Sequence, residues 1–435
     1  MLRYLLLVVF FSPFLLSADC CGGRRDDIEH SQTLENDYQQ VKEFVNSKRS
    51  IPLEEKLNCL TFSGDIRTKW AHLTERVNCH SQRGDNGILF PEEGCKDCPL
   101  LSLPSDAFEV EFNFYVDYVF DRAWAVSWLQ FNNVAGLQGS RIGCGTAKES
   151  CRGSGTSEGI CLRKAYMGYN FCTNGTFRLD VEIGRRPMWS VFTSQVQFQS
   201  RFDGILGLAS YNVCGFMDAY IKGGPFIIDE RSHHFGYIGE AGLLSIWDSR
   251  FDLIYSLVHW KKNGANRCQI RDPEGCQFVN SQLQINYFLD SDYLWSKTKL
   301  YAAILVNHDA RARKKTLNEK QNFAWYAGFL IGDVCKEGDW SLNVCYQYVE
   351  AQAIPDCDIS GIGNGNAGCS LFADGVVASS SRGRGNYQGW RFEGLYGLTN
   401  NLAIDTLIEF SSAINPKIGG RHNFSKFRLE AIYAF

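Results

Sequence analysis

The chain has 435 residues, of which 45% are hydrophobic and 14% aromatic, and its 44 basic and 48 acidic side chains give a net charge of -4. This length suits one large barrel or a few soluble domains, and the charge lacks the basic excess of a general nucleic-acid binder. No run of about 18 apolar residues follows the N-terminus, which argues against a bundle of membrane-spanning helices.

The N-terminus has the pattern of a secretory signal peptide. Arg3 precedes an apolar run, and small residues end it at Ala18, so we predict a signal peptide over 1–18 and export from the cytoplasm. Cys20 invites a lipoprotein interpretation, but Asp19 stands where a lipidation motif has a small residue. Whether Cys20 is lipidated therefore stays open.

After the signal, residues 19–56 are polar and show only partial helical spacing, so we predict a periplasmic linker or short helix there. Residues 57–435 are predicted to form the main domain. Its first strand is expected over 60–72, where apolar and charged residues alternate. The longest alternation runs over 108–120, and about thirteen residues are enough for a tilted membrane crossing.

Six hairpins with tight turns follow along the chain, and Asn174-Gly175 is the strongest turn signal. The predicted pairs are 108–120 with the strand from Trp124, 161–171 with 177–184, 235–247 with 251–260, 282–290 with 299–308, 323–334 with 340–350, and 389–398 with 402–411.

Between these hairpins the connections are long and rich in Gly, Ser, Asn and charge. They span 73–106, 133–160, 186–233, 261–281, 309–322, 351–387 and 412–423. Regular alternation of short turns with long loops is typical of an antiparallel transmembrane β-barrel. We expect about 14 strands, or about 16 if the segment 202–210 adds a pair, which is the interpretation we prefer.

The last twelve residues alternate in the same way and end on an aromatic residue. Tyr433 and Phe435 share one face with other apolar residues, while Arg428 and Glu430 lie on the other. This ending resembles the terminal strand of bacterial outer-membrane barrels. The resemblance implies that Tyr433 and Phe435 belong to an assembly signal read by the barrel-assembly machinery.

If the aromatic faces meet lipid, the charged faces line a lumen, because a charge facing lipid near the midplane costs roughly 2 to 4 kcal/mol. Acids outnumber bases eleven to seven in this set, which favours weak cation preference or a wall that selects nothing. The predicted lining residues are Asp65, Arg67, Lys69, Glu109, Glu111, Asp117, Lys164, Arg178, Asp180, Glu182, Asp252, Lys299, Arg391, Glu393, Asp405, Glu409, Arg428 and Glu430.

The motifs that suggest an enzyme lack their context. Glu109 and Glu111 have a spacing of about 7 Å that glycosidases use, but every barrel strand produces it. The glycine pattern over 363–368 precedes no expected helix, which removes the dinucleotide interpretation. We therefore predict no catalytic, cofactor-binding or metal-binding residue, and no enzyme.

The 17 cysteines imply disulfide bonds once export is granted, and the odd number leaves a thiol for a bond to another chain. Three pairs each fall within one long loop, where a disulfide would reduce the loop entropy. These candidates are Cys144 with Cys151, Cys268 with Cys276, and Cys357 with Cys369. The expected partners are outer-membrane lipid, the assembly machinery, and disulfide-linked envelope proteins or a second copy, with no nucleic acid.

Four short segments together resemble a porin family of Gram-negative outer membranes. They are Phe62-Ser-Gly-Asp-Ile-Arg67, Ile183-Gly184-Arg185, Phe202-Asp203-Gly204 and the terminal Phe435. The cysteine content is similar to that of porin-like outer-membrane proteins of chlamydia-like bacteria. The resemblance covers the chain from about residue 57 and implies a passive pore for small hydrophilic solutes and ions in the outer membrane.

A loop that folds inward, 133–160 or 186–233, would narrow such a pore. Two alternatives stay open. One is a structural or adhesive barrel, cross-linked by disulfides and closed inside. The other is a secreted, β-rich soluble enzyme or lectin.

Overall fold

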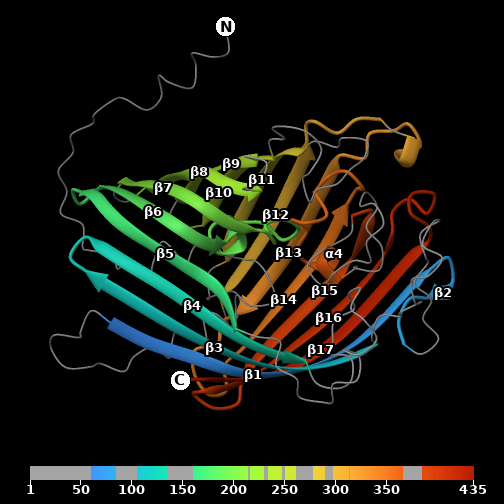
Figure 1. Ribbon diagram of the computed structural model, residues 1–435, viewed down its shortest axis with the longest axis horizontal. Coiled ribbons are helices and arrows are strands. Elements are labelled where there is room, and N and C mark those ends of the chain that lie inside the picture. The colour runs from blue at the N-terminus through green and yellow to red at the C-terminus, as the bar shows by residue number, and fades with distance from the viewer. Residues whose placement is uncertain are drawn as a thin grey trace, which may run out of the picture.

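The computed structural model describes residues 60–84, 105–134, 160–213, 216–229, 234–246, 250–260, 278–289, 297–312, 314–365 and 385–435. One sheet in these ranges holds seventeen strands, of which β2 (His80–Ser81) has two residues and the other sixteen have ten or more (Figure 1). The long strands are β1 (Leu60–Val77), β3 (Asp106–Phe120), β4 (Ala123–Val134), β5 (Ile160–Thr173), β6 (Phe177–Pro187), β7 (Arg201–Val213), β8 (Met217–Asp229), β9 (His234–Ser245), β10 (Phe251–Trp260), β11 (Phe278–Leu289), β12 (Thr298–Asn307), β13 (Phe323–Gly332), β14 (Trp340–Val349), β15 (Tyr387–Gly397), β16 (Leu402–Ala413) and β17 (His422–Ala434).

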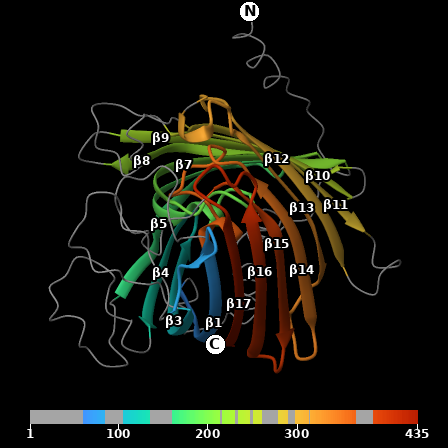
Figure 2. The ribbon, with the colours of Figure 1, turned by 90° about the vertical axis from the view of Figure 1, so that its right-hand side faces the viewer.

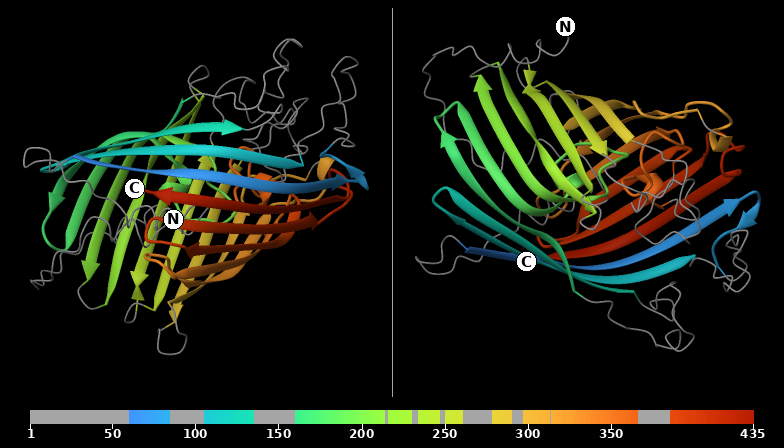
Figure 3. Two further views of the ribbon diagram at one scale, coloured as in Figure 1. Left: turned by 90° about the horizontal axis from the view of Figure 1, so that it is seen from below. Right: turned by 45° about the horizontal axis from the view of Figure 1, so that its top comes forward.

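The sheet closes on itself. β1 pairs antiparallel with β3 along one edge and with β17 along the other, and each remaining long strand pairs with its neighbours in sequence. Figures 2 and 3 show the first strand lying beside the last. The molecule is therefore an antiparallel β-barrel of sixteen long strands, which confirms the predicted fold class and the larger of the two predicted strand numbers.

The seventh hairpin lies inside the predicted long connection 186–233. There, β7 and β8 pair around a short turn, as the segment 202–210 suggested. The connection is thus divided into 188–200 and 230–233, so one link on the long-loop side is short and the predicted regular alternation is wrong at this point. Glycines such as Gly207 and Gly223 had hidden the alternation, because they add no apolar side chain to the outer face.

The two faces of the barrel differ as the sequence predicted. On β1, Ile66 and Trp70 are 45% and 41% exposed on the outer face, whereas Asp65 and Arg67, on either side of Ile66 in the sequence, are 0% and 4% exposed. The same two-residue period continues around the ring to β17, where Tyr433 is exposed and Glu430 is buried, and Phe435 directly after the strand is exposed as well. Alternation along each strand therefore defines an apolar exterior and a polar interior.

Two apolar clusters occupy the interior together with the polar wall. Their members come from strands and from the connections β6–β7 and β14–β15, as detailed below. The helical segments within the described ranges are short: η2 (Met188–Ser190), η4 (Lys314–Thr316) and α4 (Ile362–Gly365). Among the described residues, no helix combines the length and apolar character that a bilayer crossing demands.

Several sequence predictions concern residues outside the described ranges. The signal peptide over 1–18, the linker over 19–56 and the lipidation of Cys20 fall there. So do Cys144, Cys151, Cys268, Cys276 and Cys369, and nearly all of the loop 133–160. These predictions stay predictions.

Candidate functional site

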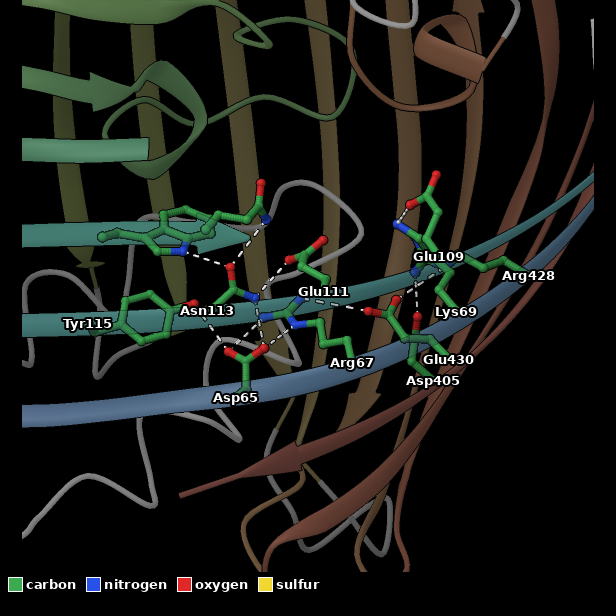
Figure 4. A network of polar contacts seen from close by, with 12 residues as sticks. Asp65, Arg67, Lys69, Glu109, Glu111, Asn113, Tyr115, Asp405, Arg428 and Glu430 are labelled. Atoms are coloured by element: carbon green, nitrogen blue, oxygen red, sulfur yellow. Dashed lines mark hydrogen bonds and ion pairs between the residues drawn. The ribbon is translucent and has the colours of Figure 1, made fainter. Parts of the chain in front are cut away.

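Inner side chains of β1, β3 and β4 form a hydrogen-bonded network centred on Asn113 (Figure 4). The Asn113 amide donates to Asp65 over 2.8 Å and to Glu111 over 2.7 Å, and its oxygen accepts from Trp128 at 2.8 Å and Gln130 at 3.2 Å. Both donors and both acceptor positions of this side chain are therefore used. The network fixes the side chains of three neighbouring strands in one arrangement.

Arg67 links this network to β17, the last strand, which pairs with β1 and closes the barrel. Its guanidinium donates to both carboxylate oxygens of Asp65, and its Nη1 lies 3.9 Å from Glu430 on β17. Glu430 is also 3.6 Å from Arg428, which in turn pairs with Asp405 on β16. Ion pairs thus connect strands at the seam where the barrel closes.

The ion pairs continue to β15. Arg391 contacts Glu409 at 3.0 Å and Glu393 at 3.5 Å, and Lys426 lies 3.6 Å from Glu409. The carboxylates of Glu393 and Glu409 are at most 4% exposed. The same holds for Arg391 of β15 and Arg428 of β17. Buried charges are tolerated when each has an opposite charge and hydrogen bonds nearby, so the wall is held by pairing.

A second group of charges lies on β6, β8 and β9. Arg178 contacts Asp180 at 2.7 Å, Arg186 pairs with Glu182, and Lys222 contacts Glu240 at 3.0 Å. Tyr220 also donates to Glu240 over 2.8 Å. Acids and bases again alternate on the inner face.

Water reaches only part of this wall. Lys69 and Glu109 contact one another at 2.7 Å and are 16% and 26% exposed, and Arg178 is 22% exposed. Asp405 and Glu430, in contrast, are 1% exposed. Strand alternation alone predicts that the charged positions line a lumen; most of them also pack against each other as ion pairs.

The structure brings every predicted lining residue to the inner face, as the alternation requires. Lys164 lies over the ring of Trp128 and Lys299 over that of Phe288. Further charged side chains on the inner face were not among the lining residues predicted from the sequence. They are Glu75, Arg163, Arg186, Lys222, Glu240 and Lys426. Lys222 and Glu240 stand opposite each other in the pairing of β8 with β9. Lys222 could be found only by recognising β8, whereas Glu240 lies within the predicted strand 235–247, whose alternation already contained the signal.

The β6–β7 loop, residues 188–200, folds into the barrel and lies against its wall. Met188, Val191, Phe192 and Phe198 are at most 5% exposed and pack on inner side chains of β7, β8, β10 and β11. The wall also binds the loop backbone: the Thr193 amide donates to Glu240 over 2.8 Å, and its carbonyl accepts from Gln282 over 2.6 Å. The sequence named the connection that contains this loop as one of two candidates for narrowing the lumen.

Residues 350–365 of the β14–β15 connection also lie inside the barrel, which the sequence did not indicate. Ile354, Ile359 and Ile362 are at most 1% exposed and pack with Val196 of the β6–β7 loop and with Tyr387 on the wall. Gln197 and Ile359 form an antiparallel bridge between the two loops. Two connections from separate parts of the ring therefore meet inside the barrel.

The structure describes six cysteines, and no disulfide bond joins any two of them. Cys79, Cys161, Cys172 and Cys335 are exposed. Cys345 is buried in the middle of β14 and faces inward. Of the candidate disulfide residues, only Cys357 is described, and its expected partner Cys369 is outside the described ranges.

Comparison with solved structures finds barrels of the porin type. They include Pseudomonas putida OprB at high pH (11% identity, TM-score 0.49, 91% of this chain and 96% of that chain covered). A Rhodopseudomonas blastica porin triple mutant is 8% identical with a TM-score of 0.41, covering 86% of this chain and all of that chain (100%). Salmonella typhi OmpF in complex with daunomycin is 10% identical, with a TM-score of 0.45 and coverage of 87% and 98%. No protein-family profile matches this chain, and no curated protein matches it in sequence.

Proposed function

We propose that the chain is an outer-membrane porin that allows passive diffusion of small hydrophilic solutes and ions. The observation that carries this proposal is the exposed apolar exterior of a closed ring. A water-soluble protein rarely leaves a contiguous apolar patch beyond a few hundred Å², whereas a barrel in a bilayer requires an apolar band around its whole circumference.

Aromatic side chains gather toward both ends of the outer face, as the girdles of a membrane barrel do. Near the short turns the exposed aromatics include Tyr118, Phe120, Phe171, Tyr211, Trp340, Tyr396 and Tyr433. Toward the long loops they include Trp70, Phe108, Phe131, Trp390, Phe410 and Phe427. The short turns would face the periplasm, and β1 would begin and Phe435 would lie on that side. The protein would reach this membrane through its signal peptide and the assembly machinery.

The interior supports a narrow, weakly selective channel. Sixteen strands enclose a ring too wide for wall side chains alone to fill, and the two inward loops reduce the space that is left. Most charged groups of the wall are engaged in ion pairs, so opposite charges largely cancel along it. Solutes would be sorted by size more than by charge, and the lining residues named above would act together without a dedicated binding site.

A second candidate function is a structural or adhesive barrel without an open pore. It is favoured by the inward loops and by the burial of charges such as Asp405 and Glu430. Disulfide bonds to other envelope proteins, or to a second copy, would then carry the function.

Planar-bilayer recording with refolded protein separates the two candidates. The porin predicts discrete current steps, and conductance should scale with the salt concentration of the bath. A variant that lacks most of 189–199 should conduct more than the intact protein, since this loop occupies the lumen. Silence of both proteins, with correct folding shown by circular dichroism, would overturn the porin and leave the structural barrel.

A further inference from the structure

The two inward loops are joined by backbone hydrogen bonds at one place. The Ser360 amide donates to the Val196 carbonyl over 2.9 Å, and the Gln199 amide donates to the Asp358 carbonyl over 3.2 Å. The Ser360 hydroxyl adds a contact of 3.0 Å to the carbonyl of Gln197. These bonds form a short piece of antiparallel ladder inside the barrel, between connections that begin on opposite parts of the ring.

Asp358 lies in this ladder with its side chain completely buried. One carboxylate oxygen, Oδ1, accepts the Ser200 amide at 3.1 Å. The other, Oδ2, is buried without a hydrogen-bond partner among the described residues. The Ser200 hydroxyl bonds the Cys357 carbonyl at 3.2 Å, so Ser200 is held from two sides. A buried carboxylate with one unbonded oxygen is costly when ionised and much less so when protonated.

Residues 188–200 and 350–365, the described parts of the two loops, contain no basic side chain. Residues 188–200 contain no ionisable side chain, and the other ionisable side chains of residues 350–364 are Glu350, Asp356 and Cys357. Glu350 accepts the amide of Phe323 at 2.8 Å, at the start of this connection. Three charged wall residues contact the described β6–β7 loop: Arg186 at Ser190, Lys222 at Phe192 and Glu240 at Thr193.

We infer that Asp358 is a proton-operated latch: the two loops stay joined across the lumen while its carboxyl group is protonated, and they separate when it is ionised. This inference rests on the proposed porin function for its effect on permeation, and on the loop contacts alone for the latch itself. The chain would therefore have a narrower channel in acid than at neutral pH.

The sign follows from the proton equilibrium. Burial raises the pKa of Asp358 from its usual 3.8 to about 7, while hydrogen bonds from Ser200 and the Phe198 amide oppose the shift. A group whose pKa is raised in the joined state stabilises that state fully below about pH 4. The stabilisation is lost as the pH rises toward 7, and it changes little above that value. The loop-opening constant should rise about tenfold per pH unit in this window, to about a thousandfold in total.

Hydrogen exchange followed by mass spectrometry tests the latch without any assumption about permeation. The refolded protein in detergent micelles is compared between pH 5 and 8, with rates corrected for the intrinsic pH dependence of exchange. Protection of 195–200 and 355–361 should fall steeply up to pH 7 in the wild type. Asp358→Asn should keep the low-pH protection throughout, and Glu319→Gln, at an exposed acid of the β12–β13 loop, should behave as the wild type.

Wild-type protection that does not change with pH would overturn the latch, whether or not the variant folds. An equal pH dependence in Asp358→Asn would overturn it as well. Bilayer currents then separate this proposal from the porin itself. Currents that rise from pH 5 to 8 in the wild type, but stay low in Asp358→Asn, support both. Currents that do not change with pH and are identical in the two proteins would support the porin function and contradict the latch. If no protein conducts, the porin function is rejected, and the exchange data still decide whether the latch exists.

Discussion

Gly64 and Phe435 exchange two backbone hydrogen bonds, each 3.0 Å long, and so join the C-terminal residue to the first strand. The absence of a side chain at Gly64 makes this contact possible. A Cβ atom at this position would lie 2.6 Å from the Asn113 carbonyl oxygen and 2.7 Å from the Phe435 ring. The last residue of the chain therefore occupies a notch that only glycine leaves open.

Gly64→Ala should weaken the closure of the barrel. The added methyl group must push aside backbone as well as the ring, and such overpacking costs about 1 to 3 kcal/mol. The unfolding midpoint in urea, measured by tryptophan fluorescence in micelles, should fall. Gly207→Ala is the matched control, since its Cβ would meet no atom closer than 3.8 Å. Equal midpoints for the two variants would contradict the role given to the notch.

The ion pairs of the inner wall should contribute to stability in proportion to their burial. Arg428 is 2% exposed between Asp405 and Glu430, so Arg428→Gln leaves two buried carboxylates without their shared cation. Removing one partner of a buried pair costs about 3 to 5 kcal/mol. Lys297→Gln removes an exposed pair with Asp333, whose members are 82% and 46% exposed, and should cost at most about 1 kcal/mol. Urea unfolding of both variants checks this order, and a larger effect at Lys297 would refute it.

The sequence was sufficient for most of the fold because strand alternation is a local property. Parity, meaning whether a residue occupies an odd or even position along its strand, is enough to place Asp65 and Arg67 inside and Ile66 outside. No knowledge of the partner strands is needed. The hairpin of β7 and β8 was harder to recognise, because Gly207 and Gly223 occupy outer positions without adding an apolar side chain. Parity is therefore reliable wherever the outer face carries large side chains.

The interior could be predicted only in part. Alternation says that a side chain points inward, but not whether another group covers it there. Burial of Glu430 depends on Arg67, Arg428 and their neighbours, which come from both ends of the chain. The bridge between Gln197 and Ile359 depends on the path of two loops, and neither loop has a periodic pattern that would reveal it.

Ion selectivity should respond to the charges that water can reach. Lys69→Glu should shift the reversal potential in a salt gradient toward cations, and Glu109→Lys should shift it toward anions, because both side chains are partly exposed on the inner face. The exchanged pair, Lys69→Glu with Glu109→Lys, conserves the local charge and should return close to the wild-type value. Shifts of the same sign in both single variants would show that these charges do not act through the field of the lumen.

Phe192 should hold the β6–β7 loop against the wall. It is completely buried, and its ring lies 5.6 Å from that of Phe198 and 6.1 Å from that of Phe202. Phe192→Ala removes packing worth about 3 to 5 kcal/mol. We expect larger and noisier single-channel currents, since the loop is released from its site. Phe410→Ala on the outer face, where the ring is 44% exposed, should leave the current unchanged. A wild-type current in Phe192→Ala would mean that other contacts suffice to hold the loop.

The exposed cysteines allow the proposed orientation in the membrane to be measured. Cys335 lies in the short turn between β13 and β14, and Cys172 lies beside the turn between β5 and β6, whereas Cys79 follows β1 at the opposite end of the barrel. If the short turns face the periplasm, a bulky, membrane-impermeant maleimide added to intact Gram-negative cells should label a variant that keeps only Cys79. Variants that keep only Cys335 or Cys172 should react only after the outer membrane is permeabilised.

Cys345 supplies the control for folding, because it is 0% exposed in the middle of β14 and should react only after denaturation. Labelling of Cys345 in the native state would show that the barrel in those cells is not correctly closed, and the other results could not then be used. With Cys345 protected, early labelling at Cys335 and late labelling at Cys79 would reverse the orientation. The long loops and the aromatic rows nearest to them would then belong to the periplasmic side.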